Sequence, residues 1–405
     1  MSAIREDSGE AVRRNVHDQP GLNPLPFGLD ALTVWDDAEA TAAHGAAVVD
    51  VGIPTIGTSP YLAESIESVL AQTLTSWRLT VSENGPGLES VRRTMEPYLG
   101  DPRVRHIVTG VRVGRGANHT IAVRSGKAPY VGVLHDDDQW HPQFLERRVA
   151  FIGANPSCGL AFGGYVVIDT SGKPVGRRRL PLREGVHRSA SVLPRLYRDM
   201  FIGPPTVLVR RTAYEAVGSE YVELVNTDFP MWVRLAANFD IGCLTVWDAD
   251  YRHHPSQTSA DRVQFTQWYF PAFDAVADLP ISRSLRRLVR AEAHVRCALD
   301  AIERAERRES LRHLAKAVRT DPLCLVRPTV AARILAGIAA LATGARGRQV
   351  LTKRRERRWH TGGAEGLLPA MPEDFWRPSA TLRSGALPLT DPGRSDGVQR
   401  GEALP

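Results

Sequence analysis

The sequence has few cysteines and no long uninterrupted apolar segment. Its four cysteines are far apart in 405 residues and form no CxxC pair, so we expect buried thiols in a reducing compartment and no zinc cluster. The N-terminal residues are charged and show no apolar core, so no signal peptide is predicted. The most apolar stretch, residues 329–345, is short and contains Arg333, which argues against a transmembrane helix. We therefore expect a cytoplasmic protein, with peripheral attachment to the inner face of the membrane left open.

The charge balance is moderately basic, with a formal net charge of +6. Such a balance suits an anionic partner, for example a nucleotide, a nucleic acid or an acidic membrane surface. A nucleic acid is not expected, because the basic residues lack interleaved aromatics and no recognition motif is present. The basic run at residues 346–358 follows an apolar stretch and could contact an anionic membrane.

The hydrophobic pattern divides the chain into four parts. Residues 1–46 are polar and without periodicity, which predicts a flexible arm. Residues 47–280 alternate short β-branched strands with amphipathic helices, which is typical of an α/β domain with a mostly parallel sheet between helices. Residues 281–345 predict a helical C-terminal region, and residues 346–405 are basic and then rich in Pro and Gly, which predicts a disordered tail. The pattern leaves homo-oligomer formation open.

Polar clusters follow three of the predicted strands. They read "PTIGTS" at residues 54–59, "SENGPG" at 82–87 and "HDDDQW" at 135–140. In such sheets ligands bind at the carboxyl ends of the strands, so the clusters are expected to share one crevice. Three adjacent aspartates are costly unless a cation neutralises them, and carboxylates suit Mg²⁺ or Mn²⁺ together with a substrate diphosphate. The motif alone leaves a solvated acidic loop equally open.

Residues 49–259 resemble the family 2 glycosyltransferases, which have the GT-A fold: a Rossmann-like mixed, mostly parallel sheet flanked by helices. The motifs that carry the resemblance, in order, are "VDVGIPTIGTSPYL", "GANHTIAVRSGKAPYVGVLHDDDQWHP", "NTDFPMWVRLAA" and "YRHHPSQTS". The resemblance implies a metal-assisted, inverting glycosyltransferase of glycan or glycoconjugate biosynthesis that uses Mn²⁺ or Mg²⁺. Its expected donor is a UDP-, GDP- or dTDP-linked sugar, and its acceptor is a hydroxyl of a glycan, glycolipid or small molecule.

The resemblance also implies roles for individual residues. The general base is Asp228, and the metal ligand is Asp137, with His135 and His254 as further candidates. Residues implied for the donor nucleotide are Pro54, Thr55, Glu83, Asn118 and Asp136. Residues implied near the donor sugar or the acceptor are Trp140, Gly203, Pro204 and Trp232, although core packing is an alternative for both tryptophans.

The chain departs from the family pattern at four positions. His135 stands where the first acid of the DxD motif is usual, and Glu83 replaces an aspartate. Ala117 replaces an arginine, and Thr227 replaces the acid that usually precedes Asp228.

These departures leave other interpretations open. One alternative is a weak or inactive relic that binds nucleotide or glycan. A nucleotidyltransferase is disfavoured because "PTIGTSPYL" lacks a Gly-rich, basic phosphate loop. For Asp228 itself, the simple alternative is a helix cap.

Overall fold

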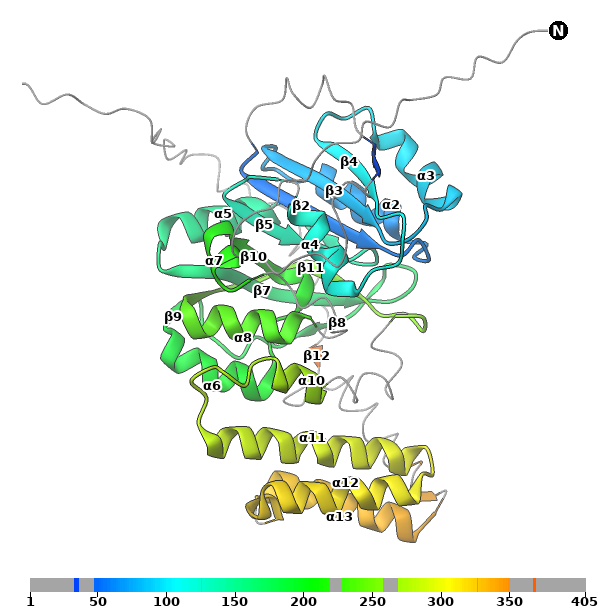
Figure 1. The fold of residues 1–405 in the computed structure, drawn as a ribbon, viewed down its shortest axis with the longest axis vertical. Coiled ribbons are helices and arrows are strands. Elements are labelled where there is room, and N and C mark those ends of the chain that lie inside the picture. The colour runs from blue at the N-terminus through cyan, green and yellow to red at the C-terminus, as the bar shows by residue number, and fades with distance from the viewer. Residues whose placement is uncertain are drawn as a thin grey trace, which may run out of the picture. The chain divides into compact units, whose positions relative to one another are not determined.

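The computed structural model describes residues 33–35, 47–124, 126–218, 227–257, 269–325, 327–344, 346–347, 349 and 367–368. Within these residues the chain forms a mixed sheet with helices packed against it (Figure 1). The strands are β1 Thr33–Trp35, β2 Val49–Thr55, β3 Trp77–Glu83, β4 Val104–Val108, β5 Tyr130–Val133, β6 Gln139–Trp140, β7 Cys158–Ile168, β8 Pro174–Arg178, β9 Gly185–His187, β10 Val207–Arg210, β11 Asp240–Arg252 and β12 Leu367–Leu368. The α-helices are α2 Leu62–Leu70, α3 Glu89–Met95, α4 Arg115–Arg124, α5 Phe144–Ala154, α6 Ser189–Asp199, α7 Arg211–Ala216, α8 Asp228–Asn238, α10 Tyr269–Asp274, α11 Arg283–Glu303, α12 Arg307–Thr320 and α13 Pro328–Ala342.

The main strand order is β1-β4-β3-β2-β5-β10-β7-β11-β6. Strands β4, β3, β2 and β5 are mutually parallel, whereas β10 runs antiparallel to both β5 and β7. The predicted mixed, mostly parallel sheet is therefore confirmed. Because β2, β3 and β5 run in one direction, their carboxyl ends lie at one edge of the sheet, where the predicted crevice belongs.

Strand β2 shows how the sheet is held between two layers of helices. Val49, Val51 and Ile53 are fully buried and pack in one core cluster with residues of α2 and α5. The alternate residue Gly52 faces α4, where a Cβ atom would lie 2.7 Å from the Ala122 Cβ. A side chain at position 52 would therefore push α4, and the residues it carries, away from the sheet.

The predicted helical C-terminal region is confirmed. Helices α11, α12 and α13 lie side by side (Figure 1) around a small apolar cluster of their own. Helix α11 also contributes Val289 and Ala293 to the main core, and Glu292 pairs with Arg198 of α6 at 3.3 Å. Among the described helices, none is long and apolar enough to cross a membrane. The predicted boundary at residue 281 falls between α10 and α11, and the division into domains stays a prediction.

Two short strands correct the prediction of a structureless arm and tail. In the arm, β1 pairs antiparallel with β4, and in the tail β12 pairs antiparallel with β8. Each strand forms by pairing with a strand that is distant in the sequence, and the local pattern of hydrophobic residues does not reveal such pairing. Nearly all of the remaining arm and tail, including most of the basic run at 346–358, lies outside the described residues.

Candidate functional site

The polar clusters that follow β2 and β5 meet, as predicted. The Thr55 hydroxyl donates to Asp136 Oδ2 at 2.5 Å, and the Ser59 hydroxyl donates to the Asp136 carbonyl at 2.6 Å. The Gly57 amide in turn donates to Thr55 Oγ1 at 2.9 Å, which fixes the loop after β2. Residues 81 positions apart are thereby joined into one loop surface beside the buried Pro54.

The residues predicted to meet the nucleotide base are tied to the sheet itself. Asn118, on α4, accepts from the Ser82 hydroxyl at 2.7 Å and donates to the Ser82 and Thr55 carbonyls at 3.1 and 3.4 Å. Glu83 is 1% exposed; one carboxylate oxygen accepts from the Leu88 amide at 2.6 Å and the other lies 3.0 Å from His106 Nε2. Both residues therefore shape the crevice, and contact with a nucleotide base stays a prediction.

Asp136, Asp137 and Asp138 form the aspartate turn, in which negative charges lie unfavourably close together. Burial and the neighbouring Asp137 charge raise the pKa of Asp136 to about 6. Asp138 is fully buried, and burial followed by the charge of Asp137 raises its pKa well above the usual value. Its Oδ1 accepts from the Arg252 amide at 2.9 Å, while Oδ2 has no hydrogen-bond partner among the residues described. Crowded carboxylates with an unpaired oxygen favour a bound cation.

Asp137 and His254 are 117 positions apart in the sequence and lie side by side in the fold. His254 Nε2 lies 2.9 Å from Asp137 Oδ2, and His254 Nδ1 lies 2.9 Å from the Ser256 hydroxyl. Arg252, which the sequence did not single out, is 1% exposed and donates from Nε to the Asp137 carbonyl at 3.0 Å. Its guanidinium lies 4.1 Å from the Tyr61 ring, so it packs the closing strand onto the aspartate turn.

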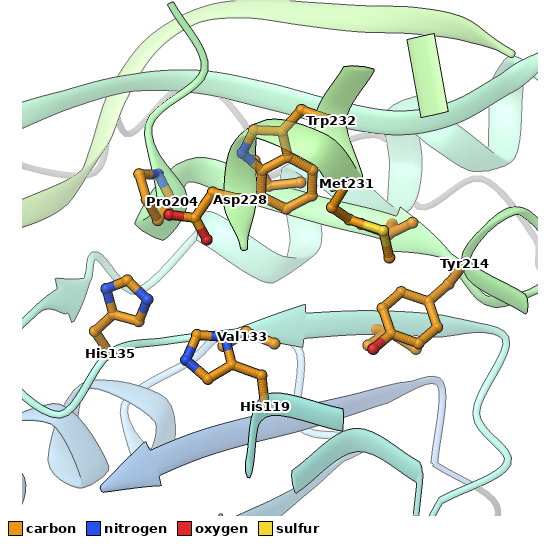
Figure 2. Close-up of a pocket in the computed structure, with 11 residues that line it drawn as sticks. His119, Val133, His135, Pro204, Tyr214, Asp228, Met231 and Trp232 are labelled. Atoms are coloured by element: carbon orange, nitrogen blue, oxygen red, sulfur yellow. The ribbon is translucent and has the colours of Figure 1, made fainter. Parts of the chain in front are cut away.

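Asp228 is the first residue of α8, and Thr227 precedes it at the cap position without a side-chain cap hydrogen bond. The helix-cap alternative for Asp228 stays open. The Asp228 carboxylate points toward His135 and His119 (Figure 2), and one ligand atom of each residue lies within 4.8 Å of the others. His119, on α4, was missed by sequence reasoning.

A small pocket, partly open to solvent, lies beside this cluster. Pro204 and Trp232 line it, and the buried Trp232 indole N–H has no hydrogen-bond partner among the described residues. The other lining residues are mostly apolar: Val131, Val133, Val207, Val209, Tyr214 and Met231, with His119, His135 and Asp228 at the polar side. The pocket therefore offers an apolar surface next to one carboxylate.

Trp140 and Gly203 help to position the 3₁₀ turn at Pro204–Thr206, which borders this pocket. Trp140 is 2% exposed, stacks on Phe144 at 4.2 Å and donates to the Pro205 carbonyl at 2.6 Å. It does not line the pocket, so core packing, the alternative interpretation, is correct for this residue. Gly203 leaves room for Tyr165, whose ring would lie 2.5 Å from a Cβ atom at position 203.

Comparisons with known proteins agree with this geometry. Residues 50–218 match the family model described as glycosyl transferase family 2. An uncharacterized glycosyltransferase of Methanocaldococcus jannaschii is 23% identical over 185 residues, which are 45% of this chain and 62% of the relative. A UDP-Glc:alpha-D-GlcNAc-diphosphoundecaprenol beta-1,3-glucosyltransferase of Escherichia coli is 20% identical over 220 residues, 54% of this chain and 82% of that protein. The chain thus spans less than two thirds of the archaeal relative.

The fold is shared with a solved structure that contains a nucleotide sugar. Residues 1–349 of TarS from S. aureus, in complex with UDP-GlcNAc, superpose with a TM-score of 0.54 at 14% identity. The superposition covers 77% of this chain and 93% of the TarS chain. The likeness confirms the predicted GT-A type of fold.

Proposed function

Because residues 50–218 belong to glycosyl transferase family 2, we propose that this chain moves a sugar from a nucleotide-diphosphate donor to an acceptor hydroxyl. The observation that carries the proposal is the position of His135. One of its ring nitrogens belongs to a cluster with Asp137 and Asp138, and it also clusters with Asp228. His135 thus lies between the carboxylate expected to face the diphosphate and the carboxylate expected to face the acceptor.

The aspartate turn fits a divalent cation. Asp137 would hold Mn²⁺ or Mg²⁺, with His135 and His254 within reach, and the unpaired Oδ2 of Asp138 marks the same surplus of negative charge. A cation bound there neutralises charge on a diphosphate leaving group. The Thr55 and Ser59 hydroxyls hold the turn in place, so the carboxylates are positioned before a donor arrives.

We propose Asp228 as the general base. It lies at the N-terminus of α8, where the helix dipole stabilises negative charge, and it faces the pocket. A carboxylate there accepts the proton of an acceptor hydroxyl while that oxygen attacks the anomeric carbon. One displacement with one base inverts the anomeric configuration. The apolar walls formed by Val133 and Met231 limit the water that competes with the acceptor.

The acceptor that we propose is a saccharide on a lipid carrier. The Escherichia relative carries a diphosphoundecaprenol acceptor in its name. Helix α13 of this chain exposes Leu335 at 65% and Ile338 at 49%, one turn apart and therefore on one face. These side chains precede the basic run at 346–358, a combination that favours contact with an anionic membrane surface.

A donor panel with matched variants tests the proposal. Binding and hydrolysis of UDP-, GDP- and dTDP-sugars are measured with Mn²⁺ and with EDTA. We expect metal-stimulated binding of one donor, its loss in Asp137→Ala, and retained binding in Asp228→Asn with transfer reduced by about 10²- to 10⁴-fold. Asp274→Asn, an exposed acid on α10, serves as the control.

Two results would contradict this function. If the donor affinity is the same with and without metal and is unchanged in Asp137→Ala, the metal and donor site is assigned to the wrong residues. Binding of a donor without turnover, with any acceptor or with water, would favour the relic, in keeping with Ala117 and Thr227 at positions where the family usually carries charge.

A further inference from the structure

We propose that His119, His135 and Asp228 form a second metal-binding site, which shares His135 with the Asp137 position, for a borderline transition ion of the Zn²⁺ class. The three residues come from α4, from the turn after β5 and from the start of α8, yet one ligand atom of each lies within 4.8 Å of the other two. The two imidazole rings lie with centroids 5.5 Å apart and planes tilted by 49°, and both face the Asp228 carboxylate (Figure 2).

The donor set selects the class of ion. Two imidazoles and one carboxylate suit Zn²⁺ or Co²⁺, whereas Mg²⁺ prefers oxygen ligands. Bond lengths of about 2.0–2.2 Å to nitrogen and oxygen place neighbouring ligands of a tetrahedral ion roughly 3.4 Å apart. Ligand atoms that already lie within 4.8 Å reach that spacing by small side-chain rotations. The fourth position faces the pocket, so it stays open to water or to a ligand oxygen.

The surroundings hold the three side chains in place. His119 is 5% exposed and sits on a helix packed against β2, β3 and β5. Asp228 is fixed by the first turn of α8, whose neighbouring residues Phe229 and Met231 are buried. Valine side chains form much of the pocket wall beside the cluster, together with Tyr214, Met231 and Trp232. Burial that locks the ligands favours metal affinity because little order is lost on binding.

Occupation of this site has a consequence that rests on the proposed function. An ion held by Asp228 withdraws electron density from the carboxylate and so weakens it as the base that would accept the acceptor proton. It also uses His135, which is shared with the Asp137 and Asp138 cluster. The geometry therefore predicts that Zn²⁺ inhibits sugar transfer while Mn²⁺ or Mg²⁺ supports it.

Ligand-field absorption of Co²⁺ tests the site without any activity measurement. The full chain carrying Asp137→Ala is titrated with Co²⁺, so that the aspartate-turn position does not contribute. We expect visible absorption from one bound ion with nitrogen ligands, displaced by Zn²⁺ and not by Mg²⁺. Adding His119→Gln or Asp228→Asn should weaken Co²⁺ binding about tenfold or more. Thermal melting shows whether each variant is folded. If His119→Gln fails to fold, Asp228→Asn still tests the site, because it changes a half-buried side chain.

His294→Ala is the decisive control, because a second imidazole pair exists on α11 and α12. There His294 Nδ1 lies 3.1 Å from His313 Nδ1. If the absorption disappears in His294→Ala and persists in His119→Gln and Asp228→Asn, the proposal is overturned, as it is if Co²⁺ gives no such absorption. Co²⁺ binding as expected in a chain that transfers no sugar would refute the proposed function and leave the site standing. Transfer that continues at saturating Zn²⁺ would refute the inhibition.

Discussion

Replacing Asp136 with asparagine should stabilise the metal-free protein at neutral pH. The folded state raises the pKa of Asp136 from 3.8 to about 6, first through burial and then through the charge of Asp137. The folded protein therefore binds this proton more tightly than the unfolded chain, so stability falls as pH rises from about 4 to 6 and is level above. About two pKa units correspond to about 3 kcal/mol, an upper value for a half-buried group. An asparagine carbonyl can still accept from the Thr55 hydroxyl.

Urea unfolding in EDTA measures this difference. We expect Asp136→Asn to gain up to about 3 kcal/mol at pH 7.5 and about 1 kcal/mol at pH 4.5. Mn²⁺ should reduce the gain, because a cation stabilises the ionised turn. Asp274→Asn, which alters an exposed carboxylate, should show no gain that depends on pH. If Asp136→Asn is no more stable than the parent at pH 7.5, the turn does not store the charge strain inferred here.

Two further changes test the frame around the site. Arg148 and Asp248 form a buried ion pair with N–O contacts of 2.8 and 3.0 Å. Arg148→Met should therefore lower the free energy of unfolding in urea by about 3–5 kcal/mol, and adding Asp248→Leu should restore much of that loss. A loss below about 1 kcal/mol in the single variant would contradict this expectation. Burial, and then the charge of His313, lowers the pKa of His294 to about 4, so stability should fall as pH drops from 6.5 to 4. His294→Phe, beside Phe270, should melt with less dependence on pH over that range, and an unchanged dependence would assign the effect elsewhere.

The order of the central elements was predictable because its signals are local. The β-branched run that gives β2 and the apolar spacing that gives α8 depend on neighbouring residues alone. Strands β1 and β12 could not be predicted, since segments of three and two residues are ordered only by pairing with β4 and β8. Pairing between segments that are far apart in the sequence produces no local hydrophobic periodicity from which a strand could be predicted.

The site was predictable where topology brings strand ends together. The contact between Thr55 and Asp136 follows from parallel strands that end at one edge. His119 was not predictable, because it is adjacent to Asn118 on α4 and successive helical residues point about 100° apart. Asn118 turns to the strand ends while His119 turns to the pocket. Arg252 was missed because a fully buried arginine is rare and reveals its role only through its partners.

His135 explains how three adjacent aspartates can occupy a largely buried turn. An acid at this position would give four consecutive carboxylates, although the pKa values of Asp136 and Asp138 are already raised. An imidazole adds no negative charge, and His135 Nδ1 lies 3.7 Å from Asp138 Oδ2. The His135 imidazole therefore lies between Asp137 and Asp138 on one side and Asp228 on the other.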